Sequence, residues 1–364
     1  MIRIALVGLG KMGLSHLAMV RPHPDVDLVA VCDTVGYVLD TLNKYTGVRT
    51  YTDYAKMLEQ EQLDAVLIST PSKTHGSMVR AALERNLHVF CEKPFSLDPE
   101  DGLALAELAE RRGLVTQVGY HYRFVGAFQE VKRLVAANAI GRIHHVLGEA
   151  YGPVVLRPKP STWRTSKSEG GGCLYDYACH ALDLMNYLVG PPTSVRGSVL
   201  NKIFSADVED EVYASMYYGS GMTGQLAVNW SDESYRKMST KITLWGTEGR
   251  IYADRQEVQI FLRGQARPEL RLDQGWNIRY TTELTDEVWF YLRGEEYSAQ
   301  IDHFVRHVQL RDPKTRCSFR DAVQADVVAG MIVRDAKGES GTSDQVGDRN
   351  AAGGSSWWRR VTGA

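Results

Sequence analysis

The sequence has little of what marks membrane, nucleic-acid-binding or secreted proteins. No apolar run approaches the ~18 residues that a membrane-spanning helix needs. The N-terminal segment MIRIALVGLG lacks the order of basic, apolar and small residues that a signal peptide shows. The formal net charge is only -2, without a long basic run. We therefore expect a soluble globular protein whose main partner is neither nucleic acid nor a membrane.

Cysteine is scarce and carries no recognisable pattern. The five cysteines are odd in number and form no CxxC pair. Cys32 and Cys91 each end an apolar run, where a free thiol behaves as a small hydrophobic group. A reduced, cytoplasmic protein is the interpretation that this usage favours. The sequence also lacks an HExxH motif, and we predict no metal site.

What is present is an alternation of strand and helix patterns over the first third of the 364 residues. Such alternation predicts βαβ units and a parallel sheet, with ligands at the carboxyl ends of the strands. Those ends fall at Gly8, Asp33, Thr70–Pro71, Glu92–Lys93 and Gly119–Tyr120. The predicted strands are 2–7, 26–33, 64–70, 87–94 and 114–120, and the predicted helices include 75–86 and 98–113.

The segment GLGKMG follows the first strand and opens a helix. Its spacing is GxGxxG, and Asp33 lies twenty residues after the last glycine, at the end of the next strand. This context predicts a dinucleotide-binding loop, because the glycines allow a tight turn and close approach of a pyrophosphate to the helix N-terminus. A glycine-rich turn of another α/β unit is the alternative. The predicted cofactor-binding residues of the loop are Gly8, Leu9, Gly10, Lys11, Met12 and Gly13.

Asp33 also bears on the choice of cofactor. Its carboxylate would accept hydrogen bonds from ribose hydroxyls and repel a 2′-phosphate, and no arginine follows it in DTVGYVLD. We therefore predict NAD. Lys44 and Arg49 lie further along and leave NADP open.

Two polar segments are candidates for chemistry. In CEKPF, Lys93 follows an apolar run and precedes a proline, which favours an extended conformation and a side chain aimed across the crevice. We expect partial burial to lower its pKa; a solvated surface lysine is the alternative. In EGGGCLYDYACHALDL, Asp176 and His180 are four apart, on one face of a helix from about Leu174, with Asp183 following. Ordinary helix residues or a metal site are the alternatives there.

The motifs GLGKMG, STPSKTH, EKP, YHYRF and GGGCLYDYACHALD occur in the order seen in one group of enzymes. The chain resembles the Gfo/Idh/MocA family over about residues 1–335. The resemblance implies an N-terminal Rossmann domain and a C-terminal domain built on a large, mostly antiparallel open sheet. It also implies hydride transfer between nicotinamide and a hydroxyl or carbonyl carbon of a sugar, cyclitol or nucleotide sugar.

The resemblance assigns roles to individual residues. Lys93 would be the catalytic lysine near the nicotinamide, where it would also bind cofactor and substrate. Hydride chemistry needs a base, and His180 fits because its ordinary pKa lies near neutrality. Asp176 would position substrate hydroxyls or His180. On the cofactor side the resemblance implies Thr70, Pro71, His75 and Glu92, and near the substrate it implies Tyr120 and Arg123.

The second half is dominated by strand-like runs, which we assign to a substrate-binding and oligomerisation domain, 123–336, after a Rossmann domain, 1–122. Tyr213 and Tyr217 on the free face of its sheet could contact another subunit, and a homo-oligomer, dimer or tetramer, is implied. Trp163 and Arg164, in a proline-rich loop, are further substrate-binding hypotheses. Residues 337–364 read as a flexible tail.

These features predict an NAD(P)-dependent oxidoreductase acting on a polyhydroxylated small molecule. A keto-sugar reductase of sugar biosynthesis is the alternative within the same chemistry, because the sequence does not fix the direction of the reaction. A non-catalytic NAD-binding sensor on the same scaffold is a second alternative. The joint presence of Lys93 and His180 disfavours the sensor.

Overall fold

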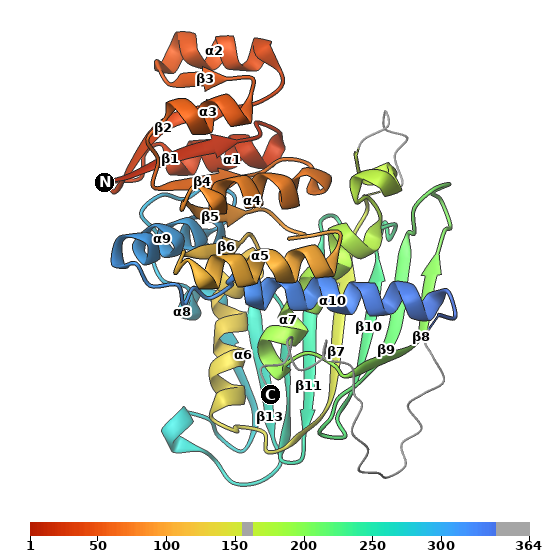
Figure 1. The fold of residues 1–364 in the computed structure, drawn as a ribbon. Coiled ribbons are helices and arrows are strands. Elements are labelled where there is room, and N and C mark those ends of the chain that lie inside the picture. Colours follow the sequence, from red (N-terminus) through yellow and green to blue (C-terminus); the bar gives the residue numbers. More distant parts are fainter. Residues whose placement is uncertain (155–162, 340–364) are drawn as a thin grey trace.

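The computed structural model describes residues 1–154 and 163–339, with the backbone alone of Trp163 (Figure 1). The first body is built on a parallel sheet with the strand order β3-β2-β1-β4-β5-β6. This order reverses between β1 and β4, where a dinucleotide binds in folds of this type. The strands are β1 (Ile2–Val7), β2 (Val26–Cys32), β3 (Arg49–Tyr51), β4 (Ala65–Ile68), β5 (His88–Cys91) and β6 (Thr116–Val118).

Apolar strands in this sheet are buried on both faces, which is why they read as continuous Val, Ile and Leu runs rather than alternating ones. Two aspartates mark helix starts in this body. The carboxylates of Asp53 and Asp98 each accept a backbone N–H of the first helical turn. The helical elements of this body are α1 (Lys11–Val20), α2 (Gly36–Thr46), α3 (Tyr54–Gln60), η1 (Ser72–Thr74), α4 (His75–Glu84), α5 (Pro99–Arg111) and η2 (His121–Phe124).

The second body is an eight-stranded sheet with the order β14-β13-β12-β11-β7-β10-β9-β8. Its neighbours are antiparallel except for the parallel pair of β7 and β10. Burial alternates along these strands because one face packs on helices and the other does not. The strands are β7 (Ile143–Tyr151), β8 (Ser194–Asn201), β9 (Glu211–Tyr217), β10 (Thr223–Asn229), β11 (Ser239–Gly246), β12 (Gly249–Ala253), β13 (Glu257–Leu262) and β14 (Gly275–Tyr280).

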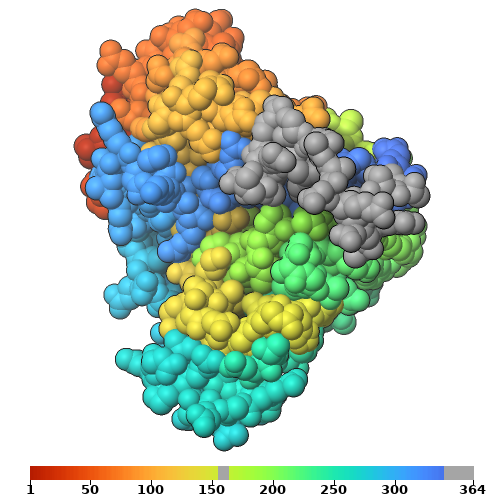
Figure 2. All heavy atoms as spheres, turned by 60° about the horizontal axis from the view of Figure 1, so that its bottom comes forward, coloured from red at the N-terminus to blue at the C-terminus, as the bar shows by residue number. Residues whose placement is uncertain are grey.

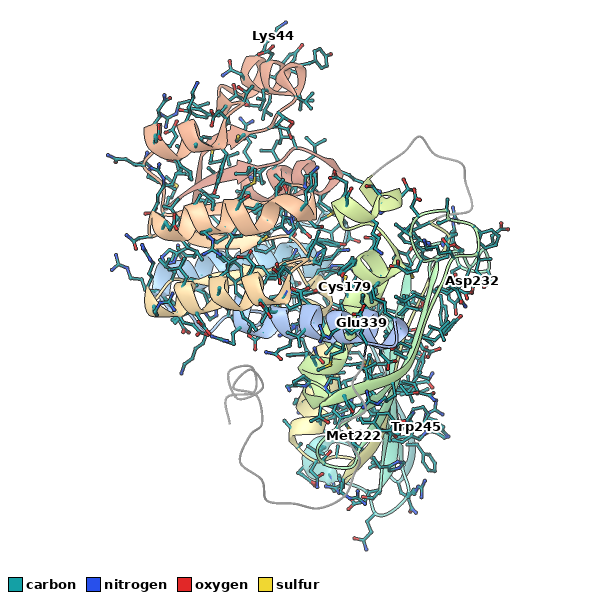
Figure 3. All side chains as sticks on the ribbon, turned by 45° about the vertical axis from the view of Figure 1, so that its right-hand side comes forward. Lys44, Cys179, Met222, Asp232, Trp245 and Glu339 are labelled. Atoms are coloured by element: carbon teal, nitrogen blue, oxygen red, sulfur yellow. The ribbon has the colours of Figure 1, made fainter. Side chains whose placement is uncertain are left out.

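Helices α6, α7 and α10 cover one face of this sheet (Figure 1), and side chains project from the other face without a helix of the described chain over them (Figure 3). The helical elements after β6 are α6 (Gly126–Ala136), η3 (Trp163–Thr165), η4 (Lys167–Glu169), a π-helical turn η5 (Leu174–Ala178), α7 (Cys179–Val189), η6 (Pro268–Leu270), α8 (Thr281–Leu284), α9 (Glu295–Leu310) and α10 (Phe319–Ala336).

Two late helices return to the first body. Ile301, Phe304 and Val305 of α9 are buried in the same hydrophobic cluster as β1 and α1, and Figure 2 shows this segment, in blue, against the red and orange first domain. Helix α10 packs on both α5 and β8 and so joins the two bodies. Within the described ranges, no helix has the length and apolarity to cross a membrane.

The expected fold class, a Rossmann domain followed by a mostly antiparallel open sheet, is confirmed. The expected elements differ in detail. Strands β3, β8 and β14 and helices α2 and α3 were not predicted. The domain boundary near residue 122 stays a prediction. The tail beyond residue 339 lies outside the described residues.

Candidate active site

The glycine loop between β1 and α1 is closed by backbone contacts that only glycine permits. Gly8 has φ +90, and a Cβ on Gly13 would lie 1.8 Å from the carbonyl oxygen of Gly8. A Cβ on Gly10, in contrast, would meet no atom of the described residues within 4 Å. Gly8 and Gly13 therefore serve the turn itself, whereas Gly10, with Leu9 before it and Lys11 and Met12 opening α1, leaves room for a phosphate at the helix N-terminus.

Asp33 at the end of β2 is fixed against this loop. Its Oδ2 accepts a hydrogen bond from the Leu9 backbone N–H at 2.5 Å, and its Oδ1 accepts one from Val35 at 2.8 Å. Lys44 and Arg49, the two cations that could have bound the 2′-phosphate of NADP, have other partners. Arg49 pairs with Glu61 at 2.7 Å, and Lys44 lies over the ring of Tyr45. The loop and Asp33 thus fit the pyrophosphate and unphosphorylated ribose of NAD.

The loop after β4 contributes a buried histidine. His75 places Nδ1 2.9 Å from the Pro94 carbonyl and Nε2 3.0 Å from the Thr70 carbonyl. Burial lowers its pKa although these acceptors oppose the change. Thr70 also accepts a hydrogen bond from Thr74 at 2.7 Å, and Pro71 begins the short turn between them. His75 therefore ties the loop after β4 to the segment that carries Lys93.

Glu92 forms a buried pair with a histidine that was not predicted. His16 of α1 lies 2.7 Å from Glu92 Oε1, and Glu92 Oε2 accepts the Lys93 backbone N–H at 3.2 Å. Burial raises the pKa of Glu92, but the hydrogen bond and charge of His16 outweigh it and the pKa is lower than usual. The pair connects the helix of the dinucleotide loop to the end of β5.

Lys93 crosses from the first body to the second. Its Nζ donates to the backbone carbonyl of Asp176 at 2.9 Å and to the Asp176 carboxylate at 3.0 Å. Burial lowers the pKa of Lys93, but the charge of Asp176 more than compensates and the pKa lies above its ordinary value. The expected lowering of this pKa is therefore wrong, because the lysine is buried together with a carboxylate rather than alone.

Asp176 has a second cationic partner. Arg164 Nε donates to the other carboxylate oxygen at 2.7 Å, which brings the substrate-binding candidate Arg164 to the site. Burial raises the pKa of Asp176, but Lys93 and Arg164 lower it by more. Asp176 is thus an anion that orients two cations. The side chain of Trp163, the other candidate of that loop, lies outside the described residues.

His180 lies one turn further along, at the start of α7. Its ring is held edge-on by three rings, at centroid distances of 6.0 Å to Tyr120, 5.1 Å to His121 and 5.2 Å to Tyr122. In the described chain its buried Nδ1 has no hydrogen-bond partner, so Asp176 does not position it. Burial, with help from the charge of Lys93, lowers the pKa of His180 well below its ordinary value. The imidazole is neutral at pH 7.

Arg123 does not line this site as expected. Its Nε and Nη2 donate to Asp183 of α7 at 2.7 to 3.1 Å, and its Nη1 donates to the Arg316 carbonyl at 2.8 Å. The pair is almost completely buried. Arg123 and Asp183 therefore brace η2 and α7, and the hypothesis that Arg123 binds substrate is corrected.

Some residues of the site lacked a usable sequence signal. Tyr297 of α9 stacks on His121 at 4.4 Å, although 176 positions separate them. Neither His121 nor Tyr297 was among the site residues predicted from the sequence. Burial lowers its pKa to about 3, so it too is neutral. Among the described residues, no group of three or more His, Cys, Asp or Glu side chains is placed to hold a metal ion.

A dinucleotide loop facing a buried lysine, carboxylate and neutral histidine defines a nicotinamide-dependent oxidoreductase. The chain belongs to the GFO/IDH/MocA oxidoreductase family. Residues 2–120 match the family model for the NAD-binding Rossmann fold, and residues 128–252 match the model for the GFO/IDH/MocA C-terminal domain. The predictions of family, activity class and cofactor are confirmed: the protein is an NAD-dependent oxidoreductase.

Several characterised proteins are similar to the chain. It is 30% identical over 258 residues to scyllo-inositol 2-dehydrogenase (NAD(+)) of Bacillus subtilis, covering 69% of this chain and 73% of the relative. It is 27% identical to myo-inositol 2-dehydrogenase of Thermotoga maritima, covering 85% and 89%. Among solved structures, GenD2 in complex with NAD superposes with a TM-score of 0.75 at 26% identity, covering 92% and 94%.

Proposed function

We propose that the protein oxidises a secondary hydroxyl of a neutral sugar or cyclitol with NAD, and that the same residues carry the reverse reduction. The names of its relatives support this substrate class, since they include inositol and D-glucoside dehydrogenases. The observation that carries the proposal is the convergence of Lys93 and Asp176 beside a neutral His180 at the carboxyl end of β5.

Lys93 is proposed to hold the reacting oxygen. Its ammonium stays charged because Asp176 raises its pKa. A charged donor in a water-poor site stabilises alkoxide character on an oxygen within hydrogen-bond distance. Arg164, bound to the same carboxylate, would contact a neighbouring hydroxyl.

His180 is proposed as the general base. A neutral imidazole can accept the hydroxyl proton as the carbon loses its hydride, and it returns that proton in the reverse direction. NAD, when bound by the glycine loop and Asp33, supplies the hydride acceptor. The rings of Tyr120, His121 and Tyr122 keep water from the base on its buried side.

The test follows NADH absorbance with the purified enzyme, NAD and a panel of cyclitols, aldoses, glycosides and uronates. We expect turnover on neutral polyols, and loss of it in Lys93→Met and His180→Asn. Tight NAD binding without turnover on any member of the panel would instead favour the non-catalytic sensor.

We also propose a cytoplasmic homo-oligomer. All five cysteines are buried and free, as in a reducing compartment. The uncovered sheet face exposes several large side chains, among them Tyr217 at 44%, Trp276 at 58% and Tyr280 at 49%. Apolar groups gathered on a bare sheet face favour contact with a second copy. Light scattering of the purified protein tests this, and a monomeric mass would refute it.

A further inference from the structure

The proposed base His180 needs something other than a hydrogen bond to fix its ring. In the described chain its buried Nδ1 has no hydrogen-bond partner. The torsion that turns an imidazole about its Cβ–Cγ bond is soft, and a hydrogen bond at the second ring nitrogen ordinarily sets the orientation of a catalytic histidine. The ring of His180 must therefore be held by what packs around it, which is the η2 turn.

His121 differs from its two neighbours in η2 in how it is supported. The rings of Tyr120 and Tyr122 belong to the hydrophobic core, at 0% and 2% exposure. His121 instead stacks on Tyr297 of α9, with the ring centroids 4.4 Å apart and the ring planes 17° from parallel. The Tyr297 hydroxyl lies 3.4 Å from His121 Nε2. Because His121 also meets the ring of His180 edge-on at 5.1 Å, it connects α9 to the base.

Tyr297 is itself supported from the first body. The guanidinium of Arg293 lies over its ring, 5.4 Å from the centroid, and donates a hydrogen bond to the hydroxyl of Ser15 at 3.3 Å. Ser15 belongs to α1, the helix that the dinucleotide loop opens. These contacts form a continuous path from the cofactor-binding helix to the ring of His180.

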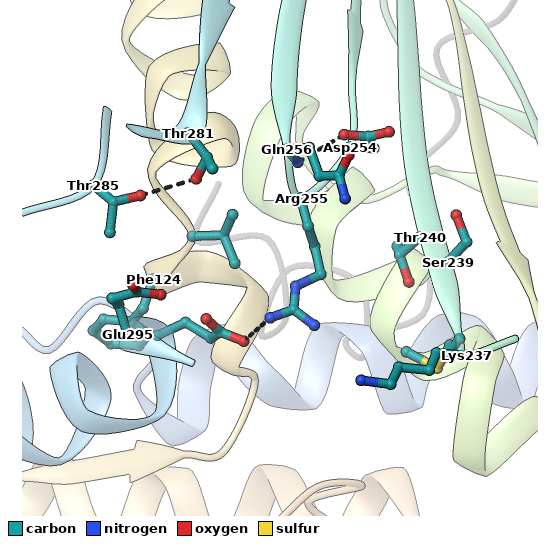
Figure 4. A pocket seen from close by; sticks show the side chains of 13 residues that line it. Phe124, Lys237, Ser239, Thr240, Asp254, Arg255, Gln256, Thr281, Thr285 and Glu295 are labelled. Atoms are coloured by element: carbon teal, nitrogen blue, oxygen red, sulfur yellow. Dashed lines mark hydrogen bonds and ion pairs between the residues drawn. The ribbon is translucent and has the colours of Figure 1, made fainter. Parts of the chain in front are cut away.

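On the other side, the junction of η2 and α9 borders a cavity. Phe124 of η2 and Glu295 of α9 are among the residues that line it, and its volume is about 470 Å³ (Figure 4). A void offers no atoms to pack against, so the elements that border it gain no support from that side. The position of His121 therefore depends on its stack with Tyr297.

We propose that Tyr297 and His121 are positioning residues for the general base, and that their stack takes the role that a hydrogen-bonded carboxylate has beside other catalytic histidines. A stacked ring suits this role because it sets a direction without adding a charge. Burial lowers the pKa of His121 to about 3, so at neutral pH it does not oppose protonation of His180. This inference rests on the proposed function, because it concerns the base of the same reaction.

The experiment measures kcat per NAD-binding site, with the sites counted by titration with NAD, so that loss of folded protein is not read as loss of catalysis. The probes are myo-inositol and glucose, and the panel that tests the function supplies another neutral polyol if neither is oxidised. Tyr297→Leu should lower kcat per site about tenfold or more, because a catalytic group displaced by about 1 Å can cost about 10²-fold. The KM for NAD should stay near that of the wild type.

Three further variants separate the stack from general packing. Tyr297→Phe keeps the ring and should keep most of the wild-type kcat. His121→Leu removes the other ring of the stack and should reproduce the loss, which also covers the case that Tyr297→Leu does not fold. Phe304→Leu is the matched control on the same helix: Phe304 is buried and packs edge-on against Phe90 at 5.8 Å. This control should lower Tm and leave kcat per site unchanged.

Each other result has a distinct meaning. Wild-type kcat per site in Tyr297→Leu or in His121→Leu would overturn the positioning role and leave the proposed function standing. A loss in Tyr297→Phe as large as in Tyr297→Leu would assign the effect to the hydroxyl and overturn the role of the stacked ring. An equal loss in Phe304→Leu would overturn it as well, because any loosening of α9 would then suffice. A wild-type enzyme that binds NAD and oxidises no member of the panel would remove the proposed function and this role with it.

Discussion

Asp176→Asn is the sharpest test of the site because it removes one charge and changes the shape little. Lys93 Nζ lies 3.0 Å from the Asp176 carboxylate, and the two side chains are only 15% and 6% exposed. At that distance and an effective dielectric constant of about 20, the attraction is about 5 kcal/mol. An asparagine keeps a hydrogen-bond acceptor but loses nearly all of this attraction.

The loss of this charge should change both the pH dependence of the activity and the stability of the protein. With the charge of Asp176 gone, burial acts on Lys93 against a weaker opposition, mainly from Glu92, and its pKa falls from the raised value. The alkaline limb of kcat/KM therefore moves to lower pH. In the wild type the folded-state pKa of Lys93 is raised and that of Asp176 is lowered. The stability from the pair is thus complete at neutral pH, is lost above pH 10.5 as Lys93 titrates, and is lost in acid as Asp176 titrates. Removing one partner at pH 7 should cost about 3–5 kcal/mol.

The assay measures kcat/KM from about pH 6 to 10 together with urea unfolding at pH 7. Asp183→Asn is the matched control, since it also breaks a buried ion pair on α7. Arg123 does not titrate in this range, so the control should lose stability without acquiring a new alkaline limb. The reasoning fails if Asp176→Asn keeps the wild-type pH profile, or if both variants shift it equally.

Other variants probe the remaining parts. Lys93→Met and His180→Asn should each lower turnover about 10²-fold or more while NAD binding, followed by fluorescence quenching, stays nearly intact. Near-normal turnover would remove that residue from the mechanism. Gly13→Ala should abolish NAD binding, because its Cβ would lie 1.8 Å from a carbonyl oxygen; unchanged NAD affinity by calorimetry would contradict this. Glu92→Gln should flatten the loss of thermal stability in acid, because the lowered pKa of Glu92 makes its contribution disappear as the pH falls through that value. If the variant loses thermal stability in acid as the wild type does, this contribution of Glu92 is excluded.

The first domain could be predicted because its evidence is local. The strand, the glycine spacing and Asp33 lie within 33 consecutive residues, and each has a separate physical role in holding a dinucleotide. The rule that ligands gather at strand ends also placed Lys93 at the site. Strand β3 could not be predicted because it is three residues long and half exposed, so it carries no apolar run.

Long-range pairs could not be predicted from local pattern. The pKa of Lys93 depends on a carboxylate 83 positions away, and the sequence alone indicates burial but not the companion charge. Likewise, the sequence suggests that Arg123 is free to bind a substrate, because it does not show the ion pair with Asp183, 60 positions away. His16 resembles any polar residue of an amphipathic helix, and only the fold reveals that it meets Glu92.

The π-helical turn carries Asp176, which accepts hydrogen bonds from Lys93 with two of its groups. In η5 the backbone N–H of Cys179 bonds to the Leu174 carbonyl, five residues back, so the turn is wider than an α-helical one. At this turn the carbonyl and the carboxylate of Asp176 both reach the Lys93 ammonium, at 2.9 and 3.0 Å. A helical pattern in the sequence predicts that Asp176 and His180 share a face, but it does not predict this widening. Asp176 in this wide turn thus binds Lys93 with both groups, while the neutral ring of His180, which we propose as the base, lies in the regular helix beyond.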